Sequence, residues 1–241
     1  MIIYRGPSEI DGSPIVVICT GIKSKSTNSK TGAMVQTYIL RADMAPIVAS
    51  RTGADSSICG ACRHKGTAQP DKAKGQAKGR SCYVTLMHGP SRVFDAFERG
   101  VYGDATAPCD AVAIGRGRQV RLGTYGDPAA VPAAVWRSLI SEAEGWTGYT
   151  HQRNAMPDVL MTSADTVGQA RLAWLRGERT FRVLASVDEI AAGELLCPAS
   201  EEAGRRTQCE RCGLCAGTGG KRCRKSIAIV AHGNGKVNFQ A

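Results

Sequence analysis

The sequence contains no run of eighteen apolar residues, so we expect no transmembrane helix and no contact with a membrane through one. Its first residues, MIIYRGPSEIDG, lack the basic segment followed by an apolar segment that marks a secretory signal, and we therefore expect a cytoplasmic protein. The sequence also lacks a Walker A loop, a G-x-S-x-G elbow and an H-E-x-x-H pair. These absences argue against a P-loop nucleotidase, an α/β-hydrolase and a zinc protease of the H-E-x-x-H type.

Acidic residues are in the minority, since 21 Asp and Glu stand against 31 Lys and Arg and leave a formal net charge of +10. The basic excess is concentrated in residues 63–80 and 205–225, and both stretches lie next to cysteines. Such stretches are typical of surfaces that contact nucleic-acid phosphates, of cations that favour nearby metal-bound thiolates, or of solvated loops. The sequence leaves these three interpretations open.

Aromatic residues make up only 5% of the 241 residues, yet the hydrophobic fraction of 43% is enough for one sizeable core. We expect a single α/β domain over residues 1–241. Residues 1–45 are predicted to hold an antiparallel hairpin, because SPIVVICTGIK and AMVQTYILRAD are β-rich runs on either side of a polar loop. Two long loops carry cysteines, one over residues 50–85 and one over residues 197–223. PSRVFDAFERGVY, between them, has the spacing of a short amphipathic helix.

Strands alternate with helical segments across residues 118–199, and a final strand is expected at residues 226–231. This alternation is typical of βαβ crossovers and a mostly parallel sheet. The strands are short and loops replace some helices, so we favour an irregular or incomplete TIM-like barrel over a doubly wound sheet. In both architectures ligands bind at the carboxyl ends of the strands. We therefore name three catalytic candidates at predicted strand ends: Tyr125, Asp127 and His151.

Several candidate residues also have a structural interpretation. Asp127 precedes Pro128 and a helical segment, as an N-cap residue would. His151 suits a structural hydrogen bond as well as it suits acid–base chemistry or metal binding. Asp165 fits an N-cap, and Cys19 alternates with apolar residues in a strand, so we expect Cys19 to be a small buried side chain.

The C-terminal cysteines follow the pattern C-x11-C-x2-C-x2-C. In a reducing cytoplasm, clustered thiols indicate metal ligands rather than disulfides. A C-x2-C-x2-C run is typical of three corners of a 4Fe-4S cluster, whereas structural zinc more often uses two separated C-x2-C pairs. We predict a 4Fe-4S cluster, with zinc as the alternative and Cys223 as an alternative fourth ligand. The four predicted ligands, called the second cysteine set below, are Cys197, Cys209, Cys212 and Cys215.

An earlier group of cysteines, called the first cysteine set below, consists of Cys59, Cys62 and Cys82. Its C-x2-C pair lies in a long loop, and we predict that the three thiols bind a metal ion or a second cluster. One possibility is a complete site, whose fourth ligand would be His64, His88 or Cys109. The other is a site with one open coordination position, as catalytic metals have.

Four segments resemble a family of uncharacterised bacteriophage proteins: SSICGACRHKG…GRSCYVTL, VRLGTYGDPAAVP, WTGYTHQ and CPASEEAGRRTQCERCGLCAG. The resemblance spans about residues 15 to 217, and the cysteine-bearing segments are its most specific parts. That family is distantly similar to phage proteins of the radical S-adenosylmethionine superfamily, which are TIM-type barrels carrying a 4Fe-4S cluster with one open iron. Here the first cysteine set is spread more widely than that superfamily's compact C-x3-C-x2-C run.

Together, the spacing and the resemblance predict a phage-encoded iron–sulfur protein in the host-cell cytoplasm. It would be a redox, radical or metal-assisted hydrolytic enzyme whose small-molecule or macromolecular substrate is unknown. The alternative is a zinc-stabilised protein without catalytic activity. That protein would bind nucleic acid through the basic loops or serve as a structural protein associated with the virion.

Overall fold

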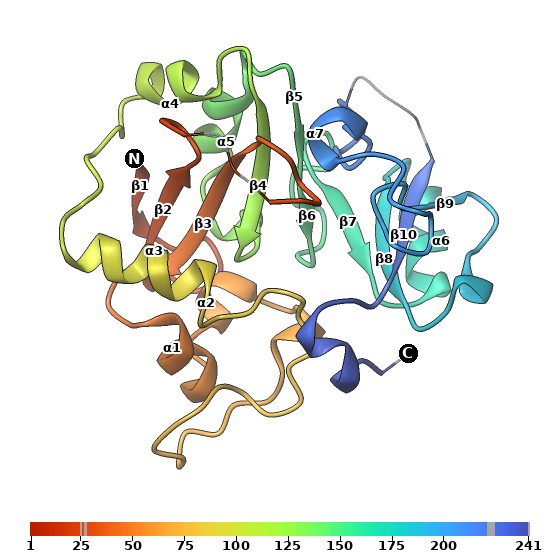
Figure 1. Cartoon of the computed structure of the whole chain (residues 1–241), viewed down its shortest axis with the longest axis horizontal. Coiled ribbons are helices and arrows are strands. Elements are labelled where there is room, and N and C mark those ends of the chain that lie inside the picture. The colour runs from red at the N-terminus through yellow and green to blue at the C-terminus, as the bar shows by residue number, and fades with distance from the viewer. Residues whose placement is uncertain (25, 27, 221–224, 241) are drawn as a thin grey trace.

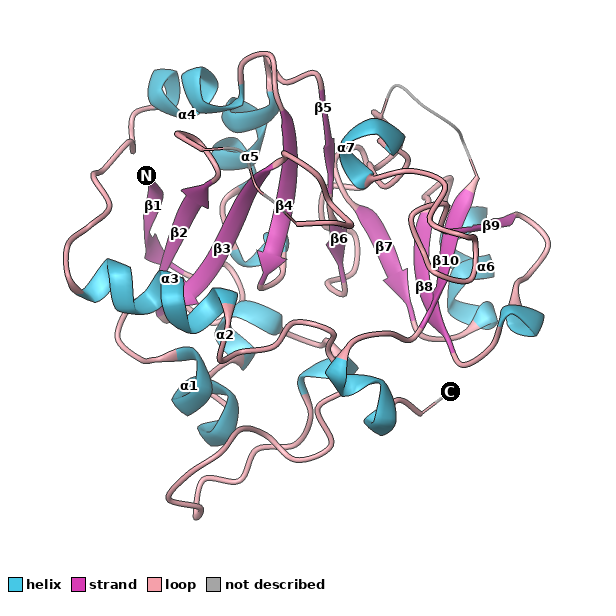
Figure 2. Cartoon of the chain, in the orientation of Figure 1, coloured by secondary structure: helices cyan, strands magenta, loops and turns pink. Residues whose placement is uncertain are grey.

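The computed structural model describes residues 1–24, 26, 28–220 and 225–240, and these form a mixed α/β fold on two five-stranded sheets (Figure 1, Figure 2). The first sheet has the order β1-β2-β3-β4-β5, with strands Ile2–Pro7 (β1), Pro14–Thr20 (β2), Val35–Arg41 (β3), Gln119–Tyr125 (β4) and Gly145–Thr147 (β5). The second has the order β6-β7-β8-β10-β9, with strands Tyr149–Thr150 (β6), Met161–Ala164 (β7), Thr180–Leu184 (β8), Glu194–Leu196 (β9) and Ser226–Val230 (β10).

The first sheet is mixed. β2 and β3 pair antiparallel, with Ile18 opposite Tyr38, which confirms the predicted hairpin. β1, which we did not predict, pairs antiparallel with the other edge of β2. β4 joins β3 in parallel and β5 joins β4 in the same direction. Residues 15–19 of β2 are all buried, as in a strand covered on both faces.

The second sheet is parallel throughout, as the alternation of strands and helices predicted. β10, the last strand in sequence, lies between β8 and β9. The two sheets meet at Gly148, whose N–H donates to the carbonyl of Cys215 and whose carbonyl accepts from the N–H of Met161. β1 and β9 are the outer edges and do not pair with each other, so the described strands form an open arch and not a closed barrel.

Helices and 3₁₀ turns connect the strands. The α-helices are Pro46–Thr52 (α1), Ser56–Cys59 (α2), Gly89–Glu98 (α3), Pro108–Gly115 (α4), Ala133–Ile140 (α5), Val167–Leu175 (α6) and Cys209–Cys212 (α7). The 3₁₀ turns are Arg63–Lys65 (η1), Pro128–Ala130 (η2), Val187–Glu189 (η3) and Asn234–Asn238 (η4). We predicted helices at α3, α5 and α6, but the helix expected over residues 187–194 is only the turn η3. None of the described helices is long and apolar enough to cross a membrane.

Two apolar clusters stabilise the arch. The larger one lies around the first sheet, where Trp136 and Leu139 of α5 are fully buried. The indole N–H of Trp136 donates to the carbonyl of Pro128 at 2.7 Å, so the buried polar atom has a partner. The smaller cluster, inside the second sheet, includes Met34, Ile227 and several thiols. Cysteines therefore form part of the core and not only of the surface.

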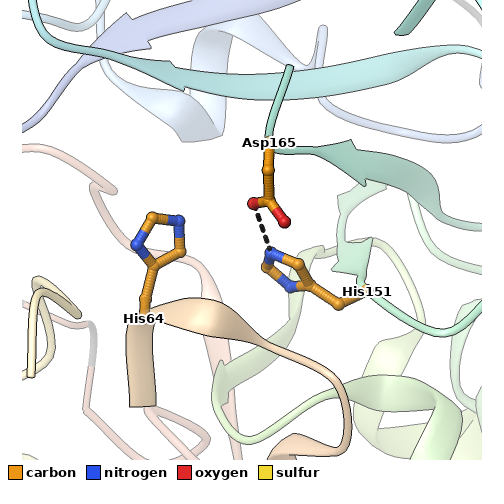
Figure 3. A group of neighbouring side chains, drawn as sticks. All are labelled: His64, His151 and Asp165. Atoms are coloured by element: carbon orange, nitrogen blue, oxygen red, sulfur yellow. Dashed lines mark ion pairs between the residues drawn. The ribbon is translucent and has the colours of Figure 1, made fainter. Parts of the chain in front are cut away.

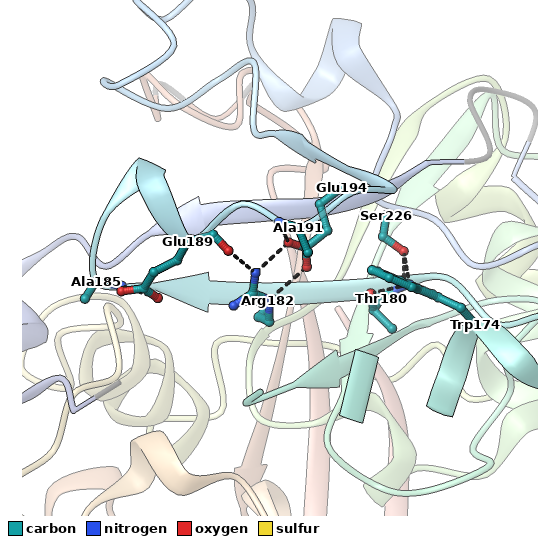
Figure 4. A network of polar contacts seen from close by, with 8 residues as sticks. All are labelled: Trp174, Thr180, Arg182, Ala185, Glu189, Ala191, Glu194 and Ser226. Carbon is teal, nitrogen blue, oxygen red and sulfur yellow. Dashed lines mark hydrogen bonds and ion pairs between the residues drawn. The ribbon is translucent and has the colours of Figure 1, made fainter. Parts of the chain in front are cut away.

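Buried polar contacts connect the strands of the second sheet across β10 (Figure 4). Arg182 of β8 donates from Nε and Nη2 to the two carboxylate oxygens of Glu194 on β9, at 2.8 and 2.6 Å. The indole of Trp174 on α6 donates to Thr180 of β8 and to Ser226 of β10. The bond from Trp174 to Ser226 joins residues 52 positions apart and holds β10 beside β8, while the Arg182–Glu194 pair holds β9 on the other side of β10.

Candidate functional site

A cavity of about 470 Å³ lies on the inner side of the arch. Both sheets line it, the first through β3 and β4 and the second through β6, β8 and β10. Tyr149 and Phe181 stack on its wall with ring centroids 4.0 Å apart. Six cysteines also line it: Cys59, Cys62, Cys82, Cys197, Cys209 and Cys215. The structure thus brings the whole first cysteine set and three of the four thiols of the second set, all but Cys212, to a single cavity, which the sequence did not indicate.

Local turns bring the first cysteine set together. Cys59 ends α2, and its carbonyl accepts a hydrogen bond from the N–H of Cys62 at 3.1 Å. The N–H of Cys82 donates to the carbonyl of His64 at 3.0 Å, which brings the distant third cysteine beside the pair. Burial raises the pKa of the Cys59 thiol well above its usual value, and the charges of Asp55, Cys62 and Cys82 raise it further.

α7 and a nearby strand hold the second cysteine set. Cys209 and Cys212 begin and end α7, and Gly213 closes the helix at a positive φ of 60° before the chain reaches Cys215. Cys197 follows β9 and donates its N–H to the carbonyl of Ala228 on β10. Burial raises the pKa of the Cys197 and Cys215 thiols, and each thiol is close enough to Cys209 and Cys212 for their charges to raise it further.

The two sets do not share the same end of the strands. The first set lies near the carboxyl end of β4, with Tyr125 and Asp127. α7 bonds to residues 30 and 31, which precede β3, and lies towards the opposite end of the arch (Figure 1). We expected Cys197 at the carboxyl rim, but β9 is short and pairs only with Ser226–Ala228, so Cys197 lies before the end of β10. The sets therefore line two different parts of the cavity.

Four cationic side chains line the cavity with the thiols, namely Lys30, Lys65, Arg80 and Arg121. Burial lowers the pKa of Lys30, while the nearby thiols Cys197 and Cys209 oppose this shift. Its Nζ lies 2.7 Å from Nε2 of His232. Arg121 is buried, bonds to the Tyr83 hydroxyl and has Cys209 among its neighbours. Buried cations beside thiols favour thiolates, which are the form that binds metals.

Arg80 and Tyr125 carry buried polar atoms that lack a hydrogen-bond partner within the described part of the chain. These atoms are Nε and Nη1 of Arg80 and the hydroxyl of Tyr125. Arg80 is 3% exposed, and its closest carboxylate contact, to Asp55, is 3.9 Å long. Burial alone would lower the pKa of Arg80, but Cys82, Tyr125 and Cys59 raise it. Because buried donors are normally satisfied, an anionic group bound beside the first cysteine set would supply the acceptors.

Asp127 holds together the segments around the first set. Its Oδ1 accepts from the N–H of Ala129 at 3.0 Å, which is the N-cap bond expected from the sequence. Its Oδ2 accepts from the N–H of His151 at 2.8 Å and from the side chain of Gln152 at 3.1 Å. The carboxylate is 6% exposed and its oxygens are engaged. Asp127 therefore positions the turn that begins at Pro128 and the segment that carries His151 and Gln152.

His151 lies at the carboxyl end of β6, where the sequence predicted it. Its Nε2 is 3.6 Å from Oδ1 of Asp165. Burial alone would lower the pKa of His151, but Cys62, Asp165 and Asp127 raise it to about 10. The expectation that Asp165 is an N-cap residue was wrong, because the Thr166 hydroxyl caps α6 and leaves the Asp165 carboxylate facing His151.

Other predicted residues are distributed more widely. His64 and His88 line the cavity, whereas Cys109 is exposed on α4 and lies outside the cavity. Cys19 is buried in the core of the first sheet, as predicted. The alternative ligand Cys223 lies outside the described residues.

The basic stretches are only partly surface features. Arg80 is turned inward, which removes it from any surface that contacts phosphates. Lys72, Lys74 and Lys78 are exposed in the first stretch. Three exposed arginines precede or lie on α7: Arg205, Arg206 and Arg211.

Comparison of this chain with protein-family models, with curated proteins and with solved structures gave no match. The residues that line the cavity between the thiols, such as Lys30, Arg121 and Tyr149, were not singled out from the sequence. They come from the hairpin loop, β4 and β6, and no local pattern relates them to the cysteines.

Proposed function

We propose that the protein binds iron–sulfur clusters through the two cysteine sets and binds its substrate in the cavity between them. The observation that carries this proposal is the convergence of both sets on one cavity that also contains buried cations. Thiolate-bound clusters are anionic, and buried positive charges compensate for that charge. The same arrangement makes little sense for free thiols, which would be open to oxidation on a cavity wall.

The second cysteine set fits a 4Fe-4S cluster. Three of its thiols are buried and one is half-buried. The short helix α7 and the left-handed backbone of Gly213 bend the C-x2-C-x2-C run. This bend would let its three thiols surround one centre, as three ligands of one cluster must. Cys197 supplies the fourth corner from the end of β9. Tyr149 bonds to Cys215, so the tyrosine fixes one of the ligands.

The first cysteine set fits a second cluster with one iron left open towards the cavity. Three thiols surround it, and the unpartnered donors of Arg80 point to an anion at this place. An open iron binds substrate directly and supplies Lewis-acid or redox chemistry. Tyr125, Asp127 and His151 would then act beside it, because Asp127 holds the His151 backbone and His151 lines the cavity.

An incomplete TIM-like barrel is supported by the parallel pairing of most strands and by the thiols that line the cavity between the two sheets. We extend the proposal to a phage-encoded protein acting in the host-cell cytoplasm. That extension rests on the resemblance of the cysteine-bearing segments to bacteriophage proteins. The reaction would be redox, radical or metal-assisted hydrolysis.

Anaerobic purification followed by iron and sulfide analysis tests the proposal. We expect a brown protein with broad absorbance near 400 nm and about eight iron and eight sulfide per chain, corresponding to two clusters of four irons each. Replacement of Cys209 by Ser should remove about half of this iron, and Cys62→Ser should remove the other half. Cys109→Ser is the matched control, because Cys109 is exposed and outside the cavity. A colourless protein with stoichiometric zinc would refute the proposal.

A second candidate function is nucleic-acid binding by a zinc-stabilised protein, either free or associated with the virion. The exposed arginines Arg205, Arg206 and Arg211 favour it, because they lie together beside the second cysteine set. Binding through phosphates would weaken steeply with salt, with a slope close to the number of phosphates contacted. Replacing the three arginines by Gln should then abolish RNA or DNA binding without loss of metal.

A further inference from the structure

Three side chains that could ligate a metal lie close together: His64, His151 and Asp165 (Figure 3). The two histidines line the cavity. One ligand atom from each lies within 4.8 Å of the others. They come from η1, from the end of β6 and from the end of β7, which are separate parts of the chain. The first cysteine set lies nearby, but these three residues contain no thiol.

Further contacts hold the three residues in place, through the side chain for His64 and through the backbone N–H for His151 and Asp165. Nδ1 of His64 lies 2.9 Å from the Ser81 hydroxyl, so Nε2 is the nitrogen left for a metal. The ring of His64 also stacks on Phe239, with centroids 5.9 Å apart. The backbone of His151 is held by Asp127, and the N–H of Asp165 donates to the side chain of Gln169 at 2.7 Å. Outer contacts of this kind orient metal ligands.

An ion pair between His151 and Asp165 does not by itself explain why the three side chains lie together. The two side chains are 3.6 Å apart, which is longer than a charged hydrogen bond of about 2.7–2.9 Å. His64 faces the same space with its ring edge-on to His151, at a centroid distance of 5.8 Å. The three ligand atoms therefore face one common space, although they come from three separate turns, as a shared metal ion requires.

We propose that His64, His151 and Asp165 bind one divalent first-row metal ion, such as Fe²⁺ or Mn²⁺, beside the cavity and separately from the cysteine sets. Two imidazoles and one carboxylate are the ligand set of non-haem Fe²⁺ sites, which leave the remaining coordination positions open. His64 and His151 line the cavity, so those positions face a ligand bound there. All three residues are partly exposed, so the ion has a path from solvent.

Titration of the anaerobically purified protein with Mn²⁺ tests this site. The loss of the electron paramagnetic resonance signal of free Mn²⁺ reports binding, and Mn²⁺ prefers oxygen and nitrogen ligands to thiolates. We expect one Mn²⁺ per chain. Asp165→Asn and His64→Gln should each raise its Kd at least ten-fold, as loss of even an outer-shell partner does.

Two variants serve as matched controls. Asp71 is an exposed acid in the loop, and His88 is an exposed histidine that also lines the cavity. Asp71→Asn and His88→Gln should leave the Kd for Mn²⁺ unchanged. Circular dichroism of every variant checks that it remains folded.

Two results would overturn the proposal. One is the absence of a saturable Mn²⁺ site in the wild-type protein at millimolar metal. The other is a site lost in Cys62→Ser but retained in Asp165→Asn, which would assign the ion to the first cysteine set. Neither result depends on iron–sulfur clusters, because sulfide analysis of the same samples reports the clusters independently.

Discussion

At the scale of single residues, Asp127 and Arg80 connect the segment that carries the first cysteine set to the rest of the molecule. The N–H of Asp127 donates to the carbonyl of Ile58, and Gln152, bonded to Asp127, also contacts the carbonyl of Cys59 at 3.4 Å. Arg80 lies beside Asp55, whose pKa is raised by burial to about 6. The cysteines therefore depend on buried polar residues for their positions.

Replacing Asp127 by Asn separates the structural role from the catalytic one. Both carboxylate oxygens of Asp127 accept hydrogen bonds from N–H groups. The asparagine amide keeps one oxygen acceptor, but its NH₂ group would face N–H donors and leave them without an acceptor. We expect the free energy of unfolding to fall by about 1–3 kcal/mol, the cost of leaving buried partners unsatisfied. Denaturant titration measures this value.

Asp71→Asn is the control for that measurement, because Asp71 is exposed and such changes stay within about 0.5 kcal/mol. An Asp127→Asn protein of unchanged stability that had lost its activity would instead support the catalytic role predicted from the sequence.

At the scale of elements, the second sheet depends on a buried ion pair. The side chains of Arg182 and Glu194 are 6% and 0% exposed and span β10 from β8 to β9 (Figure 4). β9 has only three residues, so its own ladder contributes few hydrogen bonds. The ion pair, with the bond from Arg182 to the carbonyl of Glu189, holds the β8–β9 connection in place.

Replacing Glu194 by Gln should lower the free energy of unfolding by about 3–5 kcal/mol, because it leaves the Arg182 charge buried without its partner. Thermal or denaturant unfolding measures the change. Asp104→Asn is the matched control, since Arg5 and Asp104 form an exposed pair worth less than about 1 kcal/mol. Equal effects of the two substitutions would show that burial of the Arg182–Glu194 pair is not what stabilises this sheet.

At the scale of the whole molecule, the first sheet and the cysteine-bearing segments differ in how much apolar core they have. The first sheet has an extended apolar core around β2, β3 and α5. The cysteine-bearing segments have little such core, and their backbone includes many turns. If the proposed clusters are bound, we expect them to stabilise these segments, while the first sheet is stable through its packing.

Removal of iron by a chelator tests this division. Amide hydrogen exchange should become at least ten-fold faster in peptides covering residues 56–82 and 197–215, because metal binding contributes to their local stability. Peptides from β2 and β3 should exchange at the same rate as before. Unchanged exchange in both cysteine segments would mean that the thiols do not hold a structural metal.

Sequence patterns predicted the local structure well where a single period dominates. The hairpin of β2 and β3, the amphipathic helix α3 and the parallel strands from β4 onwards all follow from such periods. β1, α1 and α4 were missed, and the helix expected at η3 was too long. Each of these is a short element whose form depends on neighbours and not on its own sequence.

Thiol spacing in the sequence was enough to name candidate metal ligands, because it limits how the thiols can surround a centre. The sequence also determined that the strands after residue 118 run parallel. The three-dimensional fold alone reveals that β10 enters between β8 and β9, that thiols of both cysteine sets line one cavity, and that His64 meets His151 and Asp165. The physical reason is that these contacts join residues far apart in the chain, and packing and buried polar pairing select them, whereas periodicity reports only on near neighbours.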